Sequence, residues 1–134
     1  VLLNSRLAPD QFNLARQVQA SCDAAKLGVA RLTGNLENAP KHDDGETTLA
    51  QLQERISEVK AYIESFSEAD FANASQSQQK HPRWADKHLT GYDFTMQFAI
   101  PNMYFHVTTA YSILRHNGLS IGKMDYLGAL PFKD

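Results

Sequence analysis

The chain has 134 residues, a formal net charge of −2 and 43% hydrophobic residues, enough for one modest core in a single domain, residues 1–134. Acidic and basic residues are interspersed, so the sequence lacks the basic footprint of nucleic-acid binding, and no apolar run is long enough to cross a membrane. The one cysteine excludes an internal disulfide and fits a reducing compartment, so we expect a cytoplasmic protein without a secretory signal.

The first helix is predicted from Pro9 to about Thr33. Proline is tolerated in a first helical turn because its missing amide would be unpaired there, and Gly34 supplies the stop. We interpret Cys22 as a buried small hydrophobe, because no cationic neighbour that would activate a catalytic thiol is evident. Apolar residues at spacings of three and four predict one buried stripe, formed by Leu14, Val18, Cys22, Ala25, Val29 and Leu32.

A loop rich in Asn, Asp, Gly and Pro follows, from Asn35 to Glu46. Its adjacent polar residues His42, Asp43 and Asp44 have the chemistry to hold a metal ion. Such residues on a mobile loop are more often solvated, and we interpret them so.

The second helix is predicted from Thr48 to Ser65, because Thr48 and Gln51 form a capping-box pattern. Its apolar residues again repeat at three and four: Leu49, Leu52, Ile56, Val59, Ile63 and Phe66. The charged residues on the other faces are expected to be solvated: Glu54, Glu58, Lys60 and Glu64.

The next segment, Phe71 to Leu89, is polar and has no helical period, which is compatible with two short strands or with a long ordered loop. Its length favours a functional or covering role. Trp84 is expected to pack on the bundle. His81 and His88 are seven residues apart, which fits no common zinc pattern, so we interpret both as surface residues.

The last helix is predicted to begin at Thr90, as N-cap, and to end at Gly118, with a kink or break near Ala99–Ile100 because Pro101 removes a backbone donor. One stripe is expected to face the core: Met103, Val107, Ala110 and Leu114. A second stripe is compatible with a polar pocket wall or with a half-solvated flank: Phe105, Thr109, Ser112 and His116. The tail after Gly118 is irregular but apolar, so it is expected to pack across the helices or at a subunit contact.

Two stretches carry a family resemblance: LLNSRLAPDQFNLARQVQ at Leu2–Gln19 and FAIPNMYFHVTTAYSILRHNGLSIGKMDYLG at Phe98–Gly128. They resemble an uncharacterised bacterial and fungal family of the DinB/YfiT-like superfamily, and ETTLAQLQERI at Glu46–Ile56 fits as well. The resemblance implies an all-α, up-down-down-up four-helix bundle, in which this chain starts after the first helix and has an irregular segment before the last. An apolar stripe would then be exposed unless a missing helix or a second subunit covers it.

Better-known members of that superfamily bind a divalent metal through one histidine on the second helix and an HxxxH pair on the fourth. By this resemblance His116 matches the second member of the pair, Ser112 stands where the first should be, and Gln19 or Ala20 stands at the remaining position. One imidazole does not hold zinc or nickel tightly. His106 is ten residues from His116 and about 80° around the helix axis, so it does not complete the set without distortion.

Each candidate residue has a functional and a structural interpretation. His116 is a general base or pocket residue left over from the metal site, or a histidine at the negative helix end. His106 is either catalytic or a core histidine bonded to a backbone carbonyl or hydroxyl. The candidate binding residues are Ser112, Thr109, Asn117 and Gln17, with Asn117 by default a C-cap and Gln17 by default a surface group.

Two functions are therefore considered. The first is a bundle with a degenerate metal site that serves as a non-metal binding or structural module, as a homodimer with a small-molecule ligand. The alternative is a hydrolase or thiol-dependent transferase that uses His116, with His106 or an acidic residue, in a remodelled pocket that retains a divalent metal.

Overall fold

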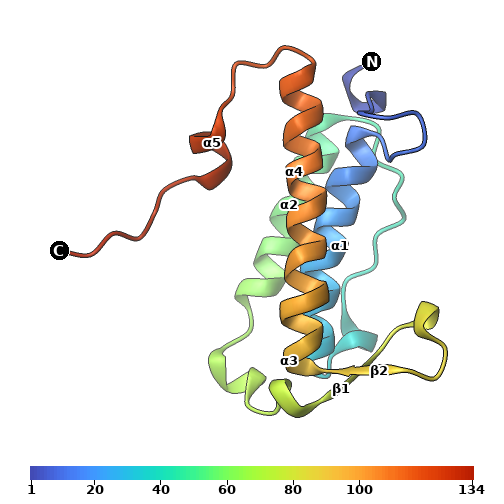
Figure 1. Cartoon of the computed structure of the whole chain (residues 1–134), viewed down its shortest axis with the longest axis vertical. Coiled ribbons are helices and arrows are strands. Elements are labelled where there is room, and N and C mark those ends of the chain that lie inside the picture. Colours follow the sequence, from blue (N-terminus) through green and yellow to red (C-terminus); the bar gives the residue numbers. More distant parts are fainter.

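The computed structural model describes residues 1–134. Three long helices lie side by side (Figure 1): α1 (Leu14–Leu32), α2 (Leu49–Glu64) and α4 (Ile100–His116). Two short helices, α3 (Gly91–Asp93) and α5 (Lys123–Leu127), precede and follow α4, and strands β1 (Gln78–Lys80) and β2 (His88–Thr90) form an antiparallel hairpin. None of these helices combines the length and the apolar character that a membrane span requires. The predicted all-α architecture is confirmed.

Helices α1 and α2 run in the same direction and α4 runs against them (Figure 1). Polar contacts show the parallel register, because Asp23 on α1 pairs with Arg55 on α2, while His42 joins Lys26 to Glu58 one turn farther along both helices. The connection between α1 and α2 therefore runs back along the whole bundle. This order corresponds to the last three helices of the predicted up-down-down-up bundle.

Two of the three predicted helix starts are confirmed. The Thr48 hydroxyl accepts from the Gln51 amide in a full capping box, and the Thr90 hydroxyl accepts from the Asp93 amide. The predicted start at Pro9 is wrong. The cap of α1 is Asn13, whose side chain accepts from the Arg16 amide, so the residues before it form turns.

Pro101 does not break its helix. Residues Phe94–Ala99 form a π-helical segment that runs directly into α4, and its wider turns accommodate the ring and the missing amide of Pro101. The chain from α3 to α4 is thus one continuous rod, and the predicted break takes the form of a widened turn.

The hydrophobic core lies where α1 contacts both other long helices. On α4 the most buried residues are Thr109 and Ile113, and Met103 is 39% exposed. The stripe expected to face the core is therefore displaced, because α1 packs against the side of α4 that carries His106, Thr109 and Ile113. The buried hydrophobic residues of the three long helices are Leu14, Cys22, Ala30, Leu52, Val59 and Ile113.

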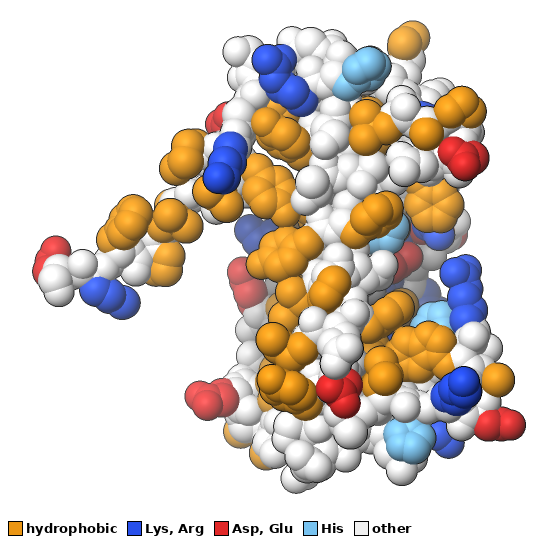
Figure 2. All heavy atoms as spheres, viewed as in Figure 1, with side chains coloured by type: hydrophobic (Ala, Val, Ile, Leu, Met, Phe, Trp, Pro, Cys, Tyr) orange, Lys and Arg blue, Asp and Glu red, His pale blue; other side chains and the backbone are white.

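The displaced stripe faces an open hollow, which we call the apolar groove, between α1, α2 and α4. It has a volume of about 280 Å³ and is lined by nine hydrophobic residues. Figure 2 shows hydrophobic side chains gathered along α4 and beside it. The hydrophobic residues that line the groove are Val18, Cys22, Ala25, Ile56, Val59, Ile63, Met103, Val107 and Ala110.

The C-terminal tail packs only in part. Tyr126 in α5 lies edge-on to Tyr111 with ring centroids 6.0 Å apart, and its hydroxyl accepts from Thr108 at 3.1 Å. Beyond α5 the chain extends away from the body (Figure 1), and Phe132 is 86% exposed. The expectation that the tail packs across the helices is therefore wrong for residues 128–134.

Candidate functional site

At the end of α4, the stripe that allowed a polar pocket wall or a half-solvated flank adjoins none of the main hollows. His116 is exposed, Ser112 is half-buried, and neither lines any of the five main hollows of the surface. Asn117 is the C-cap; its side chain donates to the Ile113 carbonyl at 2.8 Å and accepts from the Ser5 hydroxyl at 3.2 Å. Thr109 is buried and donates to the Phe105 carbonyl of its own helix at 2.7 Å.

The residues at the metal positions of the resembling family do not fit a metal. The Gln19 amide donates to Glu46 Oε2 at 2.9 Å and to the Asp44 carbonyl at 3.1 Å, so it is engaged on the α2 side of α1. His116 lies beyond the start of α1, in the last turn of α4, and His106 is about 15 Å below it along the helix axis. No three His, Cys, Asp or Glu side chains come together in a way that could hold an ion.

Two of the candidate residues do meet. His106 Nδ1 lies 2.7 Å from Gln17 Oε1, although the two are 89 residues apart in sequence, and Gln17 is only 2% exposed. The amide oxygen is an acceptor, so Nδ1 donates and Nε2 keeps its lone pair. Burial lowers the pKa of His106, and the charge of Arg16 lowers it further, so the ring is neutral at pH 7. Gln17 thus fixes both the tautomer and the orientation of this histidine.

His106 lines a hollow of about 360 Å³ between α1 and the α3–α4 rod, which we call the polar cleft. Its walls come from residues four apart, which lie one above another on a helix face. On the rod these are Phe94, Phe98, Asn102 and His106, and on α1 they are Arg16, Ala20, Ala24 and Gly28, with Phe12 just before the helix. The small side chains leave room for the hollow, and a Cβ at Gly28 would lie 3.7 Å from that of Ala99.

An aromatic wall closes the hairpin end of the cleft. The Trp84 ring lies edge-on to Phe98 at 5.2 Å and to Phe94 at 6.5 Å, and His81 lies 5.3 Å from Trp84. Trp84 therefore packs on the bundle, as the sequence predicted. His81 is half-buried rather than a surface residue; burial lowers its pKa, and Arg31 and Arg83 add to the effect.

The hairpin is fixed to the rod where β2 meets α3. The Gly91 amide donates to the Ser77 carbonyl at 2.8 Å, and a Cβ at Gly91 would clash with the Ala74 carbonyl oxygen. Only glycine fits this close approach. The wall therefore has a defined position relative to α4.

The polar cleft has an excess of positive charge. Arg16, Arg31 and Arg83 line it, and its one acidic residue, Asp23, already binds Arg55 at 2.9 Å and Lys26 at 3.1 Å. Arg31 is half-buried and donates only to the Lys80 carbonyl, at 2.6 Å. Burial lowers its pKa, and no carboxylate offsets that effect. The cleft therefore contains a partly desolvated cation without an anionic partner.

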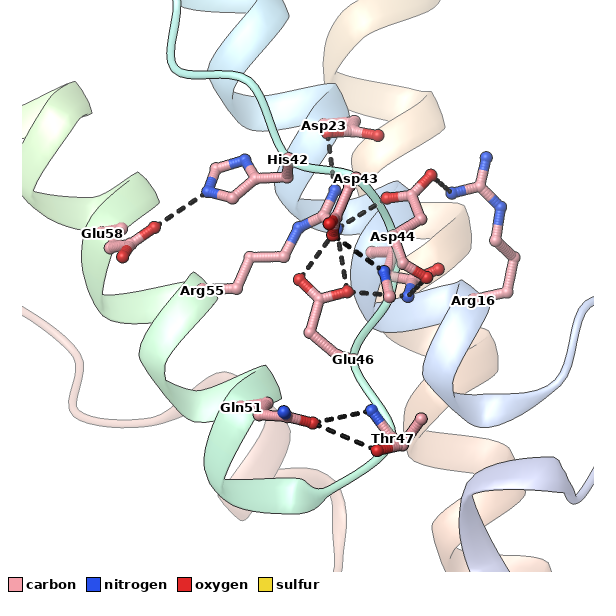
Figure 3. A network of polar contacts seen from close by, with 12 residues as sticks. Arg16, Asp23, His42, Asp43, Asp44, Glu46, Thr47, Gln51, Arg55 and Glu58 are labelled. Carbon is pink, nitrogen blue, oxygen red and sulfur yellow. Dashed lines mark hydrogen bonds and ion pairs between the residues drawn. The ribbon is translucent and has the colours of Figure 1, made fainter.

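A second polar cluster lies across α1, where Arg55 is buried among carboxylates (Figure 3). Its Nη1 donates to Asp44 Oδ1 at 2.6 Å and to Glu46 Oε1 at 3.1 Å, and its Nη2 donates to Asp23 Oδ1 at 2.9 Å. Burial of Arg55 favours a lower pKa, but the three carboxylates outweigh it and raise the pKa. We call this cluster the Arg55 network. The charge of Arg55 is paired with three carboxylates, although its buried Nε has no partner, and this pairing indicates a structural clamp.

The network also corrects two expectations. The side chain of His42 is only 10% exposed; Lys26 donates to its Nδ1 at 2.9 Å, and its Nε2 donates to Glu58 at 3.0 Å. His42, Asp44 and Glu58 are therefore engaged rather than simply solvated. The signal that sequence reasoning missed is Arg55 itself, a charged residue on the buried face of α2 between Leu52 and Val59.

Comparisons with known proteins agree with this fold. A crystal structure of a DinB family member protein from Shewanella denitrificans is 69% identical to this chain and superposes with a TM-score of 0.96, covering all of this chain and 75% of that one. No curated protein matches the chain. The family model described as a domain of unknown function, DUF1993, matches residues 1–127, and the chain therefore belongs to the DUF1993 family.

Proposed function

We propose that this protein is a binding module for a small organic anion, and that the ligand lies in the polar cleft rather than at a metal. The observation that supports this is Arg31, a half-buried cation that makes no ion pair and stands beside an aromatic wall. Partial burial of a charge without a partner is unfavourable, and an anionic ligand would supply the opposite charge that Arg31 lacks.

A ligand anion would gain more here than at the surface. Charge-assisted hydrogen bonds to a planar guanidinium contribute about 1.5–3 kcal/mol each, and partial burial reduces competition from water. Arg83 adds a second cation at the same end, and Trp84 and Phe98 offer flat surfaces to an unsaturated ligand.

Isothermal titration calorimetry tests this function. Benzoate and phenyl phosphate are expected to bind and neutral benzamide is not. Arg31→Gln is expected to lower the affinity by about 10- to 100-fold. Arg115→Gln is the matched control, because Arg115 also donates to a backbone carbonyl, that of Leu119, but lies outside the cleft. Equal binding of benzoate and benzamide, or an unchanged affinity in Arg31→Gln, contradicts the proposal.

A second candidate, the structural module, is supported by the apolar groove. The groove is open and almost wholly apolar, and Ile56 and Met103 at its rim are 39% exposed each. Such surfaces favour association, and two copies of the chain that share this face form the homodimer proposed here. Analytical ultracentrifugation is expected to show a dimer that Met103→Lys converts to a monomer. A monomer at all concentrations in the unsubstituted protein removes this candidate.

The alternative of a hydrolase or transferase centred on His116 has less support, since His116 is exposed and lines none of the five main hollows. Cys22 offers no thiol chemistry in its place. It is buried, and burial raises its pKa, so the neutral thiol persists at pH 7. A reducing, cytoplasmic setting suits this free cysteine.

A further inference from the structure

The two ends of the polar cleft differ in chemistry. Gly28 on α1 packs beside Ala99 on the rod, and this contact marks one level of the cleft. Arg31 lies three residues after Gly28, toward the hairpin. His106 lies seven residues after Ala99, in the opposite direction, because the two helices are antiparallel. At 1.5 Å per residue the two levels are about 15 Å apart. The cleft is thus a trough along the α1–α4 seam, longer than a single ring.

The hairpin end is cationic and the far end presents an acceptor. Arg31 and Arg83 supply hydrogen-bond donors with positive charge. At the far end His106 is held by Gln17 through Nδ1, so the Nε2 lone pair has no partner in the protein. Arg16 is near, but its Nη1 binds Asp44 at 2.8 Å and its guanidinium lies over Phe12.

Between these ends the cleft is lined mainly by small side chains, with Asn102 and the already paired Asp23 as its polar residues. Ala20, Ala24 and Gly28 on α1 face Ala99 on the rod, with Leu27 beside them. These small side chains leave room for an extended, unbranched chain along the floor.

We propose that the polar cleft takes an elongated organic anion in one orientation. Its carboxylate binds Arg31 and Arg83, its apolar chain lies along the small-residue floor, and a terminal hydroxyl donates to Nε2 of His106. This inference rests on the proposed function and adds the length of the ligand and the group at its far end.

Calorimetry with four matched probes tests length, charge and the terminal donor. The expected order of affinity is 12-hydroxydodecanoate above dodecanoate, by about 2- to 10-fold for one neutral hydrogen bond, and both above hexanoate. Dodecane-1,12-diol, which has no charge, binds weakest. Arg31→Gln weakens the two long acids alike, whereas Met103→Lys on the apolar groove changes neither.

Gln17→Glu tests the far end. A carboxylate beside Nδ1 raises the pKa of His106, so that Nε2 becomes a charged donor. The preference then moves from 12-hydroxydodecanoate to dodecanedioate by about 10-fold or more. Gln17 is buried, so His106→Asn serves if that variant does not fold: it is expected to remove the advantage of the hydroxyl and keep the affinity for dodecanoate.

The outcomes separate the two proposals. Tight binding of dodecanedioate by the unsubstituted protein, or equal binding of hexanoate and dodecanoate, overturns this inference and leaves the anion-binding function intact. Failure of every anion to bind overturns both. Loss of the binding in Met103→Lys shows that the probes enter the apolar groove, which also overturns the inference.

Discussion

Arg55 and Arg31 are the same residue type in opposite electrostatic situations. Arg55 is almost fully buried and binds three carboxylates, which raise its pKa against the effect of burial. Arg31 is half-buried and binds one carbonyl, and burial lowers its pKa unopposed. Arg55 on α2 is thus a cation whose charge is paired, and Arg31 on α1 is a cation without an anionic partner.

The contrast between the two arginines separates a structural role from a binding role. Removing a buried cation that binds three carboxylates leaves those groups facing one another, so the fold depends on it. Removing a cation without an anionic partner relieves a desolvated charge, so the fold gains or loses little while the proposed anion site loses its binding group.

Arg55→Met is expected to lower the free energy of unfolding by about 3–5 kcal/mol, because Asp23, Asp44 and Glu46 lose their common partner. Urea denaturation followed by circular dichroism measures the loss. Arg115→Met, an exposed arginine on α4, is the control and should change little. A loss below about 1 kcal/mol in Arg55→Met contradicts the clamp, since a surface substitution has that size of effect.

Acid is expected to weaken the same network. Burial raises the pKa of both carboxyls, but other contacts outweigh it and both pKa values are lowered on folding. For Asp44 these contacts are chiefly Arg55 and Arg16, and for Glu46 they are a backbone hydrogen bond and Arg55. Their contribution is therefore full above the unfolded pKa of about 4 and is lost as the pH falls through the folded values. Unfolding free energies at pH 7 and pH 3 should differ less in Asp44→Asn than in the unsubstituted protein, and Asp43→Asn should not reduce the difference.

His42→Ala is expected to destabilise by about 1–2 kcal/mol, because buried Lys26 loses one of its two partners and Glu58 loses its donor. Thermal unfolding measures the change. His88→Ala, on the exposed strand β2, is the matched control. An equal effect of both substitutions would show that the 35–47 connection is held by other contacts.

Arg31→Gln is expected to change the unfolding free energy by no more than about 0.5 kcal/mol while it removes anion binding. Urea denaturation and calorimetry on the same sample measure the two effects. A loss of stability comparable to that of Arg55→Met would show that Arg31 is structural, and the comparison between the two arginines would fail.

Local signals in the sequence predicted much of the fold. Thr48 and Thr90 are caps whose partners lie three residues away, so the sequence alone contains both halves of each interaction. The stripe on α4 was misplaced because hydrophobicity does not say which neighbour a helix meets. Here α1 presents Gln17, and the side of α4 that carries His106 turns toward it.

The candidate site depends on contacts that no single stretch contains. His106 and Gln17 are far apart in sequence. The polar cleft is lined by residues four apart on two antiparallel helices and by residues of the hairpin. The expected site at Ser112 and His116 came from a resemblance whose ligand residues are replaced here. The sequence shows that Arg55 interrupts the apolar stripe of α2. Its three partners come from α1 and the 35–47 connection, and only the packing of the folded chain brings them together.

The π-helical segment before Pro101 sets the rotational phase between the two halves of the rod. Each residue in a regular helix turns the chain by about 100°, so deleting one residue from Phe94–Ala99 would swing the hairpin and its aromatic rings around the axis. The His106–Gln17 contact, which lies above the deletion, would keep its place. An insertion or deletion within this segment would therefore reorient the aromatic wall without altering the rest of the bundle.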